Sequence, residues 1–461
     1  MRTDSSREEV RFSLIAQVKS GCRQLMEHHL AALLFLALVA LTLSGGGNAF
    51  NVGVIGSALC LAGVVQKGTA VDLWVLIPLM VFQAFSMVSA YVSQGTVVVA
   101  YVSVLLILPV VYLLMACLSR EELDLLRRLC VLWVGAVAAV GILQFLCRAL
   151  TRGAVRLDGI VGSPNALGIF LVLGWFALTA PQDRDAKLWC HMEPILLAAL
   201  ALTLSMGSFV SMAAGILTSL LLEKRRSTWR EVFRRACVIL ARASVGVGIG
   251  MLMYIAARRT DYPWLSLLAA LYLLAAAWNW DLFLRFLEER PRAALAAACA
   301  GVLVAAAAIL SRPNAVDTFA ERIQMTVNGL GYMARNPLLG VGPLRWRMLN
   351  YYDNDPYFNV WHIHNSLVHI GAETGAVAMG ALIAVAVRHF WKKGGEKPGG
   401  MAFLIHCLLD TGLFIVSIPL LAVLTVSEPG SGGKQLSSFW TRSFFLVTLG
   451  VFVFNITHLP S

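Results

Sequence analysis

The sequence predicts an all-α, polytopic integral membrane protein with about 14 transmembrane helices. Of its 461 residues, 58% are hydrophobic and 14% are charged, whereas a soluble domain carries about 25% charged residues. The mean hydropathy is +0.74, and apolar runs long enough to cross a bilayer, which takes about 20 residues, recur along the chain. These observations exclude an ordinary soluble enzyme and a disordered chain.

The sequence divides into a short N-terminal segment and a membrane domain. Residues 1–28 mix charged residues with spaced apolar ones, which predicts an amphipathic helix on the cytoplasmic membrane surface and not a cleaved signal. Residues 29–461 form one predicted transmembrane domain. Its spans are expected at 29–47, 50–66, 72–93, 96–118, 127–147, 165–181, 193–206, 208–223, 236–257, 263–283, 293–311, 366–390, 400–425 and 440–458.

The distribution of basic residues predicts the orientation. With the N-terminus in the cytoplasm, cytoplasmic segments hold about 25 of the 37 Lys and Arg residues. Both termini are then expected in the cytoplasm. The net charge of +11 reflects basic residues distributed between the two sides of the membrane, so we expect no nucleic-acid partner. The nine cysteines lie mostly in apolar segments without metal-binding spacing, so no metal site or disulfide framework is expected.

The basic residues on the outer side are almost all arginine. A guanidinium group pairs bidentately with phosphate oxygens, which lysine cannot match, so this pattern indicates an anionic ligand such as a lipid diphosphate. Single arginines could instead reach lipid headgroups. The set is Arg148, Arg152, Arg156, Arg258, Arg259, Arg312, Arg322, Arg335, Arg345, Arg347 and Arg442.

One outer segment, residues 312–365, is long and polar, and long ordered loops are usually functional. It contains a Pro- and Gly-rich turn at 336–343. Its aromatic residues allow two interpretations: anchors at the membrane interface, or a surface for sugar rings. They are Trp346, Tyr351, Tyr352, Tyr357 and Trp361.

Three blocks of the outer side resemble the O-antigen ligase and polymerase family of bacterial membrane glycosyltransferases, which are similar to the GT-C class. His364-Asn365, with nine residues before Gly375, resembles the family's most diagnostic pattern, from which Ala378 departs. The other two blocks are Arg322 with the run Asn336-Pro337-Leu338-Leu339-Gly340-Val341-Gly342, and Arg156-Leu157-Asp158-Gly159 with Ser163-Pro164-Asn165-Ala166-Leu167-Gly168.

Two further features depart from the family. Its members commonly have Ser-Arg-Gly at a hairpin where this chain has Ser205-Met206-Gly207. The arginines that could replace the missing one are Arg258, Arg259, Arg345 and Arg347. The family usually has about twelve helices, and the extra pair here would be residues 236–283.

The resemblance implies a metal-independent transferase of the inner membrane that uses no cofactor. Its donor would be a glycan on undecaprenyl diphosphate, and its acceptor a sugar hydroxyl, on lipid A–core for a ligase or on another lipid-linked glycan for a polymerase. His364 would handle the acceptor proton, and Arg322 would stabilise the departing diphosphate. Further substrate-binding candidates are Arg156, Arg258, Arg259, Arg345, Arg347, Trp361, Asn365 and Glu373.

Several residues have simpler expected roles. Asn365 is placed to cap a helix beginning near Ser366. Glu373 is expected to hold an arginine such as Arg322, because a carboxylate inside a membrane helix usually has a partner. His406 and Asp410 share a helix face, and we interpret them as an interhelical polar contact.

The competing class is a transporter or flippase of lipid-linked glycans. It predicts repeated halves and ionisable residues near the membrane midplane, and neither pattern stands out. Ligase is slightly favoured over polymerase because the long outer segment is single and compact.

Overall fold

The computed structural model describes residues 28–153, 155–180, 191–258, 262, 264–310, 315–353, 360–430 and 432–458. In these residues the regular structure is helical, apart from one antiparallel strand pair, β1 (Ala70–Val71) and β2 (Lys434–Gln435). The all-α class is therefore confirmed. The predicted amphipathic helix at 1–28 lies outside the described residues except for His28.

The described helices follow one another with short connections. In the first half they are α2 (His29–Leu43), α3 (Ala49–Val64), α4 (Leu73–Gln94), α5 (Thr96–Val102), η1 (Ser103–Leu106), α6 (Ile107–Ala116), α7 (Arg120–Arg152), η2 (Gly159–Val161), α8 (Pro164–Thr179), α10 (Glu193–Thr203) and α11 (Met206–Lys224). In the second half they are α12 (Trp229–Ala257), α13 (Leu265–Trp278), α14 (Trp280–Glu289), α15 (Pro291–Leu310), α16 (Ala315–Arg335), α17 (Trp346–Asp353), α18 (Ser366–Thr374), α19 (Ala376–Trp391), α20 (Lys397–Leu409), η3 (Gly412–Phe414), α21 (Ser417–Val426) and α22 (Ser438–His458).

Six helices in the described part of the chain are long and apolar enough to cross a membrane, and α13 with α14 makes a seventh if this pair, bent by 66°, is one span. The other predicted spans are mostly shorter helices, such as α2, α3, α8 and α10. These helices are consistent with a helical membrane protein, but the predicted total of 14 spans is not confirmed.

Several predicted spans are divided into shorter elements, and two of these breaks lie near the candidate site. The span 366–390 divides at Gly375, whose φ of +94° favours glycine. A side chain there would collide with the carbonyl of Leu338 in the Pro/Gly-rich turn. The span 400–425 divides after Leu409 into α20 and α21.

The second break makes a hairpin. The amide of Glu396, just before α20, donates to the carbonyl of Val426 at the end of α21, at 3.0 Å, so both ends of the hairpin lie together. The expectation that both termini lie in the cytoplasm counted 400–425 as one crossing. The membrane sides on which the two termini lie stay a prediction.

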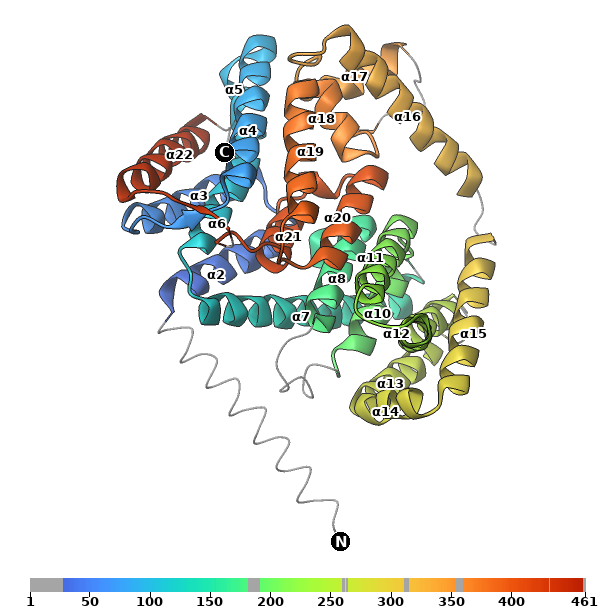
Figure 1. The fold of residues 1–461 in the computed structure, drawn as a ribbon. Helices are drawn as coiled ribbons and strands as arrows, with labels where there is room; N and C mark the ends of the chain where they lie inside the picture. The colour runs from blue at the N-terminus through green and yellow to red at the C-terminus, as the bar shows by residue number, and fades with distance from the viewer. Residues whose placement is uncertain are drawn as a thin grey trace.

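Figure 1 shows how these elements are arranged. Helices α4 and α19 stand side by side, α17 lies at the top near α18, α16 descends along the right side, and α7 runs across beneath. Helix α8 is central, since all its residues from 166 to 177 are buried; a helix that is apolar all round is a buried helix. Its first turn, which carries Asn165, points toward the break between α20 and α21.

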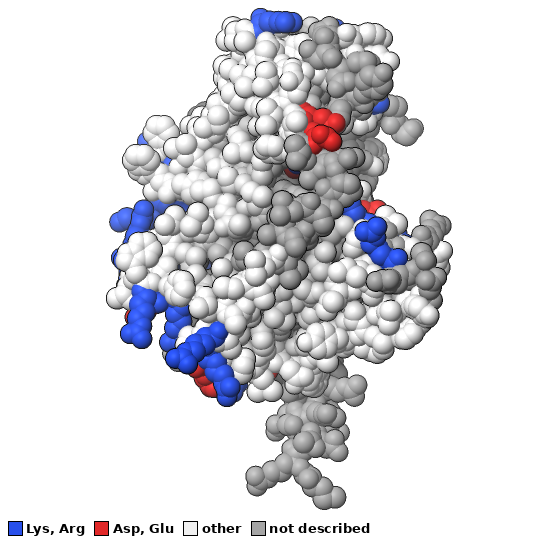
Figure 2. Space-filling view, turned by 90° about the vertical axis from the view of Figure 1, so that its right-hand side faces the viewer, with Lys and Arg blue, Asp and Glu red and all other residues white. Residues whose placement is uncertain are grey.

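The charged side chains are unevenly distributed on the surface. On the face shown in Figure 2, the described side chains are mostly uncharged, and Lys and Arg lie in a few separate groups. Large apolar side chains are exposed on many helices, among them Leu217, Leu271 and Val447. A surface of this kind suits contact with lipid and not with water.

Candidate active site

The candidate site is centred on Asp410, at the break between α20 and α21. Asp410 is in an extended conformation and ends α20, with its amide donating to His406 O at 2.8 Å. Its Oδ1 accepts a hydrogen bond from the next amide, Thr411 N, at 2.8 Å. Gly412 follows, and a Cβ there would lie 2.8 Å from the ring of His406. The Asp-Thr-Gly turn thus stops the helix and leaves the Asp410 carboxylate inside the protein, with 4% of its side chain exposed.

The Asp410 carboxylate binds side chains from three separate segments. Oδ1 lies 3.3 Å from Nδ1 of His364. Oδ2 accepts from Nδ2 of Asn165 at 2.7 Å and lies 3.4 Å from Nη2 of Arg322. The Asp410 backbone carbonyl also accepts from Oγ of Ser366 at 2.7 Å. We call Asp410, His364, Arg322, Asn165 and Arg156 the Asp410 cluster.

Arg322 reaches the cluster from α16. Its Nη1 donates to the carbonyl of Leu409 at 2.9 Å, which satisfies one of the free carbonyls at the end of α20. Its Nε has no hydrogen-bond partner among the described residues, although 25% of the side chain is exposed. The Nε atom itself is buried, so the guanidinium is fixed by two contacts and only the exposed part of the side chain is open to a ligand.

Arg156 joins the cluster through Asn165 and not through Asp410. Its Nη2 donates to Oδ1 of Asn165 at 2.8 Å, and its Nε donates to the carbonyl of Thr203 at the end of α10, at 2.9 Å. The neighbouring Leu157 amide donates to Leu202 O at 2.9 Å. The segment before α8 is thus tied to α10, and Arg156 orients the amide that in turn holds Asp410.

His364 immediately precedes α18. Asn365 caps this helix, since its side chain accepts from the Val368 amide at 3.1 Å, so its structural role is as predicted. A carboxylate at Nδ1 favours the proton on that nitrogen, which leaves Nε2 as the basic atom. With 24% of the His364 side chain exposed, the arrangement suits proton transfer with a ligand.

Glu373 does not hold Arg322, contrary to the sequence-based expectation. Its two carboxylate oxygens accept from the amides of Leu344 and Trp346, both at 3.0 Å. His369, on the same helix, lies 3.3 Å away. Glu373 therefore neutralises the N-terminal end of α17, because the turn at 336–343 folds back onto α18. We call Glu373, His369 and the amides of Leu344 and Trp346 the Glu373 cluster.

His362 lies between these clusters but carries no polar contact to either carboxylate. Its ring stacks on Phe414 at a centroid distance of 4.7 Å and meets the edge of His369 at 4.9 Å. Burial, assisted by the neighbouring His369, lowers the pKa of His362 from 6.5 to about 4. His362 is consequently a neutral aromatic residue at physiological pH.

The other predicted binding residues lie outside the Asp410 cluster. The guanidinium of Arg347 lies 4.1 Å from the ring centroid of Trp361, which is 61% exposed. Arg345 is exposed before α17, and Arg258 is exposed at the end of α12. Arg259 lies outside the described residues. Arg347 is half-buried, so the pair presents mainly the exposed ring of Trp361, which suits contact with a sugar or a lipid headgroup.

Met206, where the family commonly has arginine, is the first residue of α11. Its neighbour Gly207 is close to the site: a Cβ there would lie 3.8 Å from the His406 ring and 4.0 Å from Asp410 Oδ2. His406 itself is fully buried, and neither ring nitrogen has a hydrogen-bond partner in the described part of the protein. The expected polar contact through His406 is thus not formed, and Asp410 makes its contacts elsewhere.

The family models and the characterised proteins with which we compared the sequence gave no match. The resemblance to O-antigen ligases and polymerases therefore rests on the three sequence blocks alone. The structure shows where residues of these three blocks lie. Arg156 and Asn165 of one block, Arg322 of the second and His364 of the third converge within two contacts of one carboxylate.

Sequence reasoning named His364, Arg322 and Arg156 but missed the centre that joins them. Asp410 was interpreted, together with His406, as an interhelical polar contact; Asp410 does make such contacts, with Asn165 and Arg322, but it was not recognised as the centre of the cluster. Its signal was the Asp-Thr-Gly sequence at 410–412, a turn pattern inside a predicted helix. Among the described residues no three His, Cys, Asp or Glu side chains are grouped as a metal site would require.

Proposed function

We propose that the protein is a membrane glycosyltransferase that moves a glycan from a polyprenyl diphosphate, most simply undecaprenyl diphosphate, to a hydroxyl of an acceptor sugar. The single observation that supports this proposal is the Asp410 cluster. A histidine held by a carboxylate lies beside an arginine bound to the same carboxylate, and both side chains are partly exposed. These are the groups that such a transfer needs.

In the proposed reaction the acceptor oxygen attacks the anomeric carbon of the donor. The acceptor proton passes to Nε2 of His364, and Asp410 stabilises the imidazolium from the Nδ1 side. The bond between the anomeric carbon and the phosphate oxygen breaks, so the polyprenyl diphosphate leaves with the bonding electron pair. No external oxidant or reductant is needed.

Arg322 is proposed to stabilise the leaving diphosphate. Its fixed positive charge and partly exposed side chain suit a phosphate oxygen. Arg156 acts as a positioning residue through Asn165. The pair of Arg347 and Trp361 is exposed near the same segment and is proposed to contact the glycan.

The finer topology belongs to the same proposal. The shorter apolar helices would complete a GT-C-like bundle in a bacterial inner membrane, with the N-terminus in the cytoplasm and the Asp410 cluster facing outward. Because α20 and α21 form a hairpin, α22 would end on the outer side.

Ligase is the proposed form, with lipid A–core as the acceptor. A polymerase would use the same residues and the same chemistry on a different acceptor. A flippase is disfavoured because it would gain little from a carboxylate–histidine pair at the end of a helix beside a partly exposed arginine.

The test is glycan transfer in a cell deleted for its own ligase or polymerase and supplied with the native donor. The protein is compared with its His364→Ala and Arg322→Ala forms at matched expression, and lipopolysaccharide mobility on gels is the readout. Arg335→Ala is the matched control, since Arg335 is also on α16 but is exposed and lies over Tyr332.

We expect a banded ladder with the unaltered protein and the control, and none with the two site variants. The acceptor that carries the glycan separates ligase from polymerase. If His364→Ala and Arg322→Ala restore a normal ladder, the catalytic assignment is wrong.

A further inference from the structure

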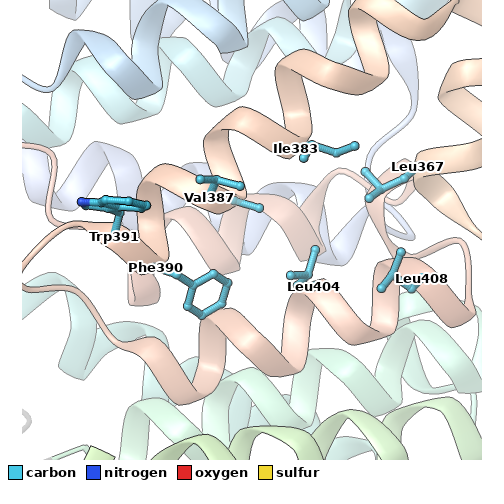
Figure 3. A pocket seen from close by; sticks show the side chains of 8 residues that line it. Leu367, Ile383, Val387, Phe390, Trp391, Leu404 and Leu408 are labelled. Carbon is cyan, nitrogen blue, oxygen red and sulfur yellow. The ribbon is translucent and has the colours of Figure 1, made fainter.

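An open apolar groove of about 600 Å³ runs between α19 and α20. Its walls are aliphatic and aromatic side chains, with Ile383, Val387, Phe390 and Trp391 on α19 and Leu404 and Leu408 on α20. Figure 3 shows Leu367 and Leu408 at one end of the groove and Trp391 at the other. The groove opens to the outside of the protein, since Val387 is 54% exposed and Trp391 is 82% exposed.

One end of this groove adjoins the Asp410 cluster. Leu408 precedes Leu409, whose carbonyl binds Arg322 at 2.9 Å. Leu367 follows Ser366, whose hydroxyl binds the carbonyl of Asp410 at 2.7 Å. An apolar chain lying in the groove would therefore end within a residue or two of the charged site.

The charges at the two ends differ. At the far end, Lys392 is already engaged, because its Nζ donates to Glu428 O at 2.7 Å and lies 3.3 Å from Asp72. At the near end, 25% of the Arg322 side chain is exposed, compared with 10% for Lys392 at the far end. An amphiphile with an anionic head is thus best accommodated with its head at Arg322 and its tail toward Trp391.

We propose that this groove binds the isoprenoid chain of the donor lipid, with the diphosphate at Arg322. This inference rests on the proposed function, and it adds where the lipid lies. A branched, unsaturated chain fits the groove through van der Waals packing against aliphatic and aromatic walls, and it needs no polar partner along the groove.

The first experiment maps binding without requiring transfer. The purified full-length protein in detergent is irradiated with undecaprenyl diphosphate that carries a diazirine in its chain, and the labelled residues are identified by mass spectrometry. Labels on 383–391 and 404–408, displaced by unlabelled undecaprenyl diphosphate but not by a common phospholipid, would support the proposal. Labels elsewhere, or equal displacement by phospholipid, would overturn it.

The second experiment fills the groove. Val387→Trp and Ala386→Phe occupy it from the exposed side, and Val447→Trp is the control, since Val447 is 68% exposed on α22. Transfer from an undecaprenyl donor should fall at least about tenfold, the loss expected when roughly two methylene groups leave an apolar site. Transfer from a geranyl diphosphate donor should be unchanged.

The two proposals fail in different ways. If the protein is not a transferase, no donor supports transfer, yet labelling still shows whether the groove binds the chain. If the groove assignment is wrong and the function is right, both groove-filling variants transfer from the undecaprenyl donor as fast as the control.

Discussion

Two buried carboxylate–histidine pairs lie close together in this protein, and they differ in what else they bind. Asp410 binds side chains, namely His364, Arg322 and Asn165, from three separate segments. Glu373 binds backbone amides and a histidine one turn earlier on the same helix. His364 is 24% exposed, whereas His369 is 4% exposed.

The difference distinguishes the proposed reactive site from a structural one. A carboxylate whose hydrogen bonds all go to amides and a buried histidine fixes a turn and offers no group to a ligand. A carboxylate that orients partly exposed cationic and basic side chains prepares them for a substrate. Sequence spacing alone cannot tell these cases apart, because both pairs combine an acidic residue and a histidine in apolar surroundings.

The largest effect should come from Asp410→Asn. We expect the transfer rate per folded molecule to fall about 10²- to 10⁴-fold, because the neutral amide no longer stabilises the His364 imidazolium. The rate is measured with purified protein and corrected for the folded fraction. Glu373→Gln is the matched control and should keep its rate per folded molecule within about threefold. Equal losses for both variants would remove the distinction between the clusters.

A smaller loss of transfer rate is expected for Arg156, because its contact with Asp410 runs through Asn165. Arg156→Ala should lower transfer about 10- to 100-fold, because Asn165 loses the partner that orients its amide toward Asp410. Arg148→Ala is the control, since Arg148 pairs with Asp158 in the same region. An Asn165→Ala variant should lose no further activity when Arg156→Ala is added. Losses that multiply would show that Arg156 contacts the substrate itself.

Glu373→Gln should lower the free energy of unfolding. The amide side chain retains one acceptor but presents an N–H₂ group to a backbone N–H, so one buried donor is left unpaired. The expected loss is about 1–3 kcal/mol, seen as a lower midpoint of thermal unfolding in detergent. Asp410→Asn should lower the midpoint less, because Arg322 is 25% exposed and can bind water. The opposite order would assign the structural role to Asp410.

The smallest effect concerns His362. Its pKa is lowered to about 4 from an ordinary 6.5, so the unfolded chain takes up a proton before the folded protein does. His362 therefore reduces stability as the pH falls from about 6.5 to 4 and has no such effect above this window. His362→Phe, which keeps the stacking on Phe414, should raise the unfolding midpoint relative to the unaltered protein at pH 5 but not at pH 8. A pH-independent difference would contradict this.

The sequence was sufficient for the helical class and for naming three members of the Asp410 cluster. Hydropathy identified the apolar segments, and the resemblance selected His364, Arg322 and Arg156. It was not sufficient for the helix breaks, because Gly375 and Asp410 end helices within segments that are apolar on both sides. The predicted partner of Arg322, Glu373, was also wrong. Glu373 is closer to Arg322 in the sequence than Asp410 is. However, the turn at 336–343 folds back onto α18, and the amides that follow it bind the Glu373 carboxylate.

The most direct test of the account is a double-mutant cycle between His364 and Asp410. Transfer rates are measured for His364→Ala, Asp410→Asn and the combined variant, each corrected for folded protein. If the two residues act as one proton-transfer unit, the combined variant is no slower than His364→Ala alone. If the two losses multiply, the residues act independently, and the carboxylate–histidine pair is not the catalytic centre.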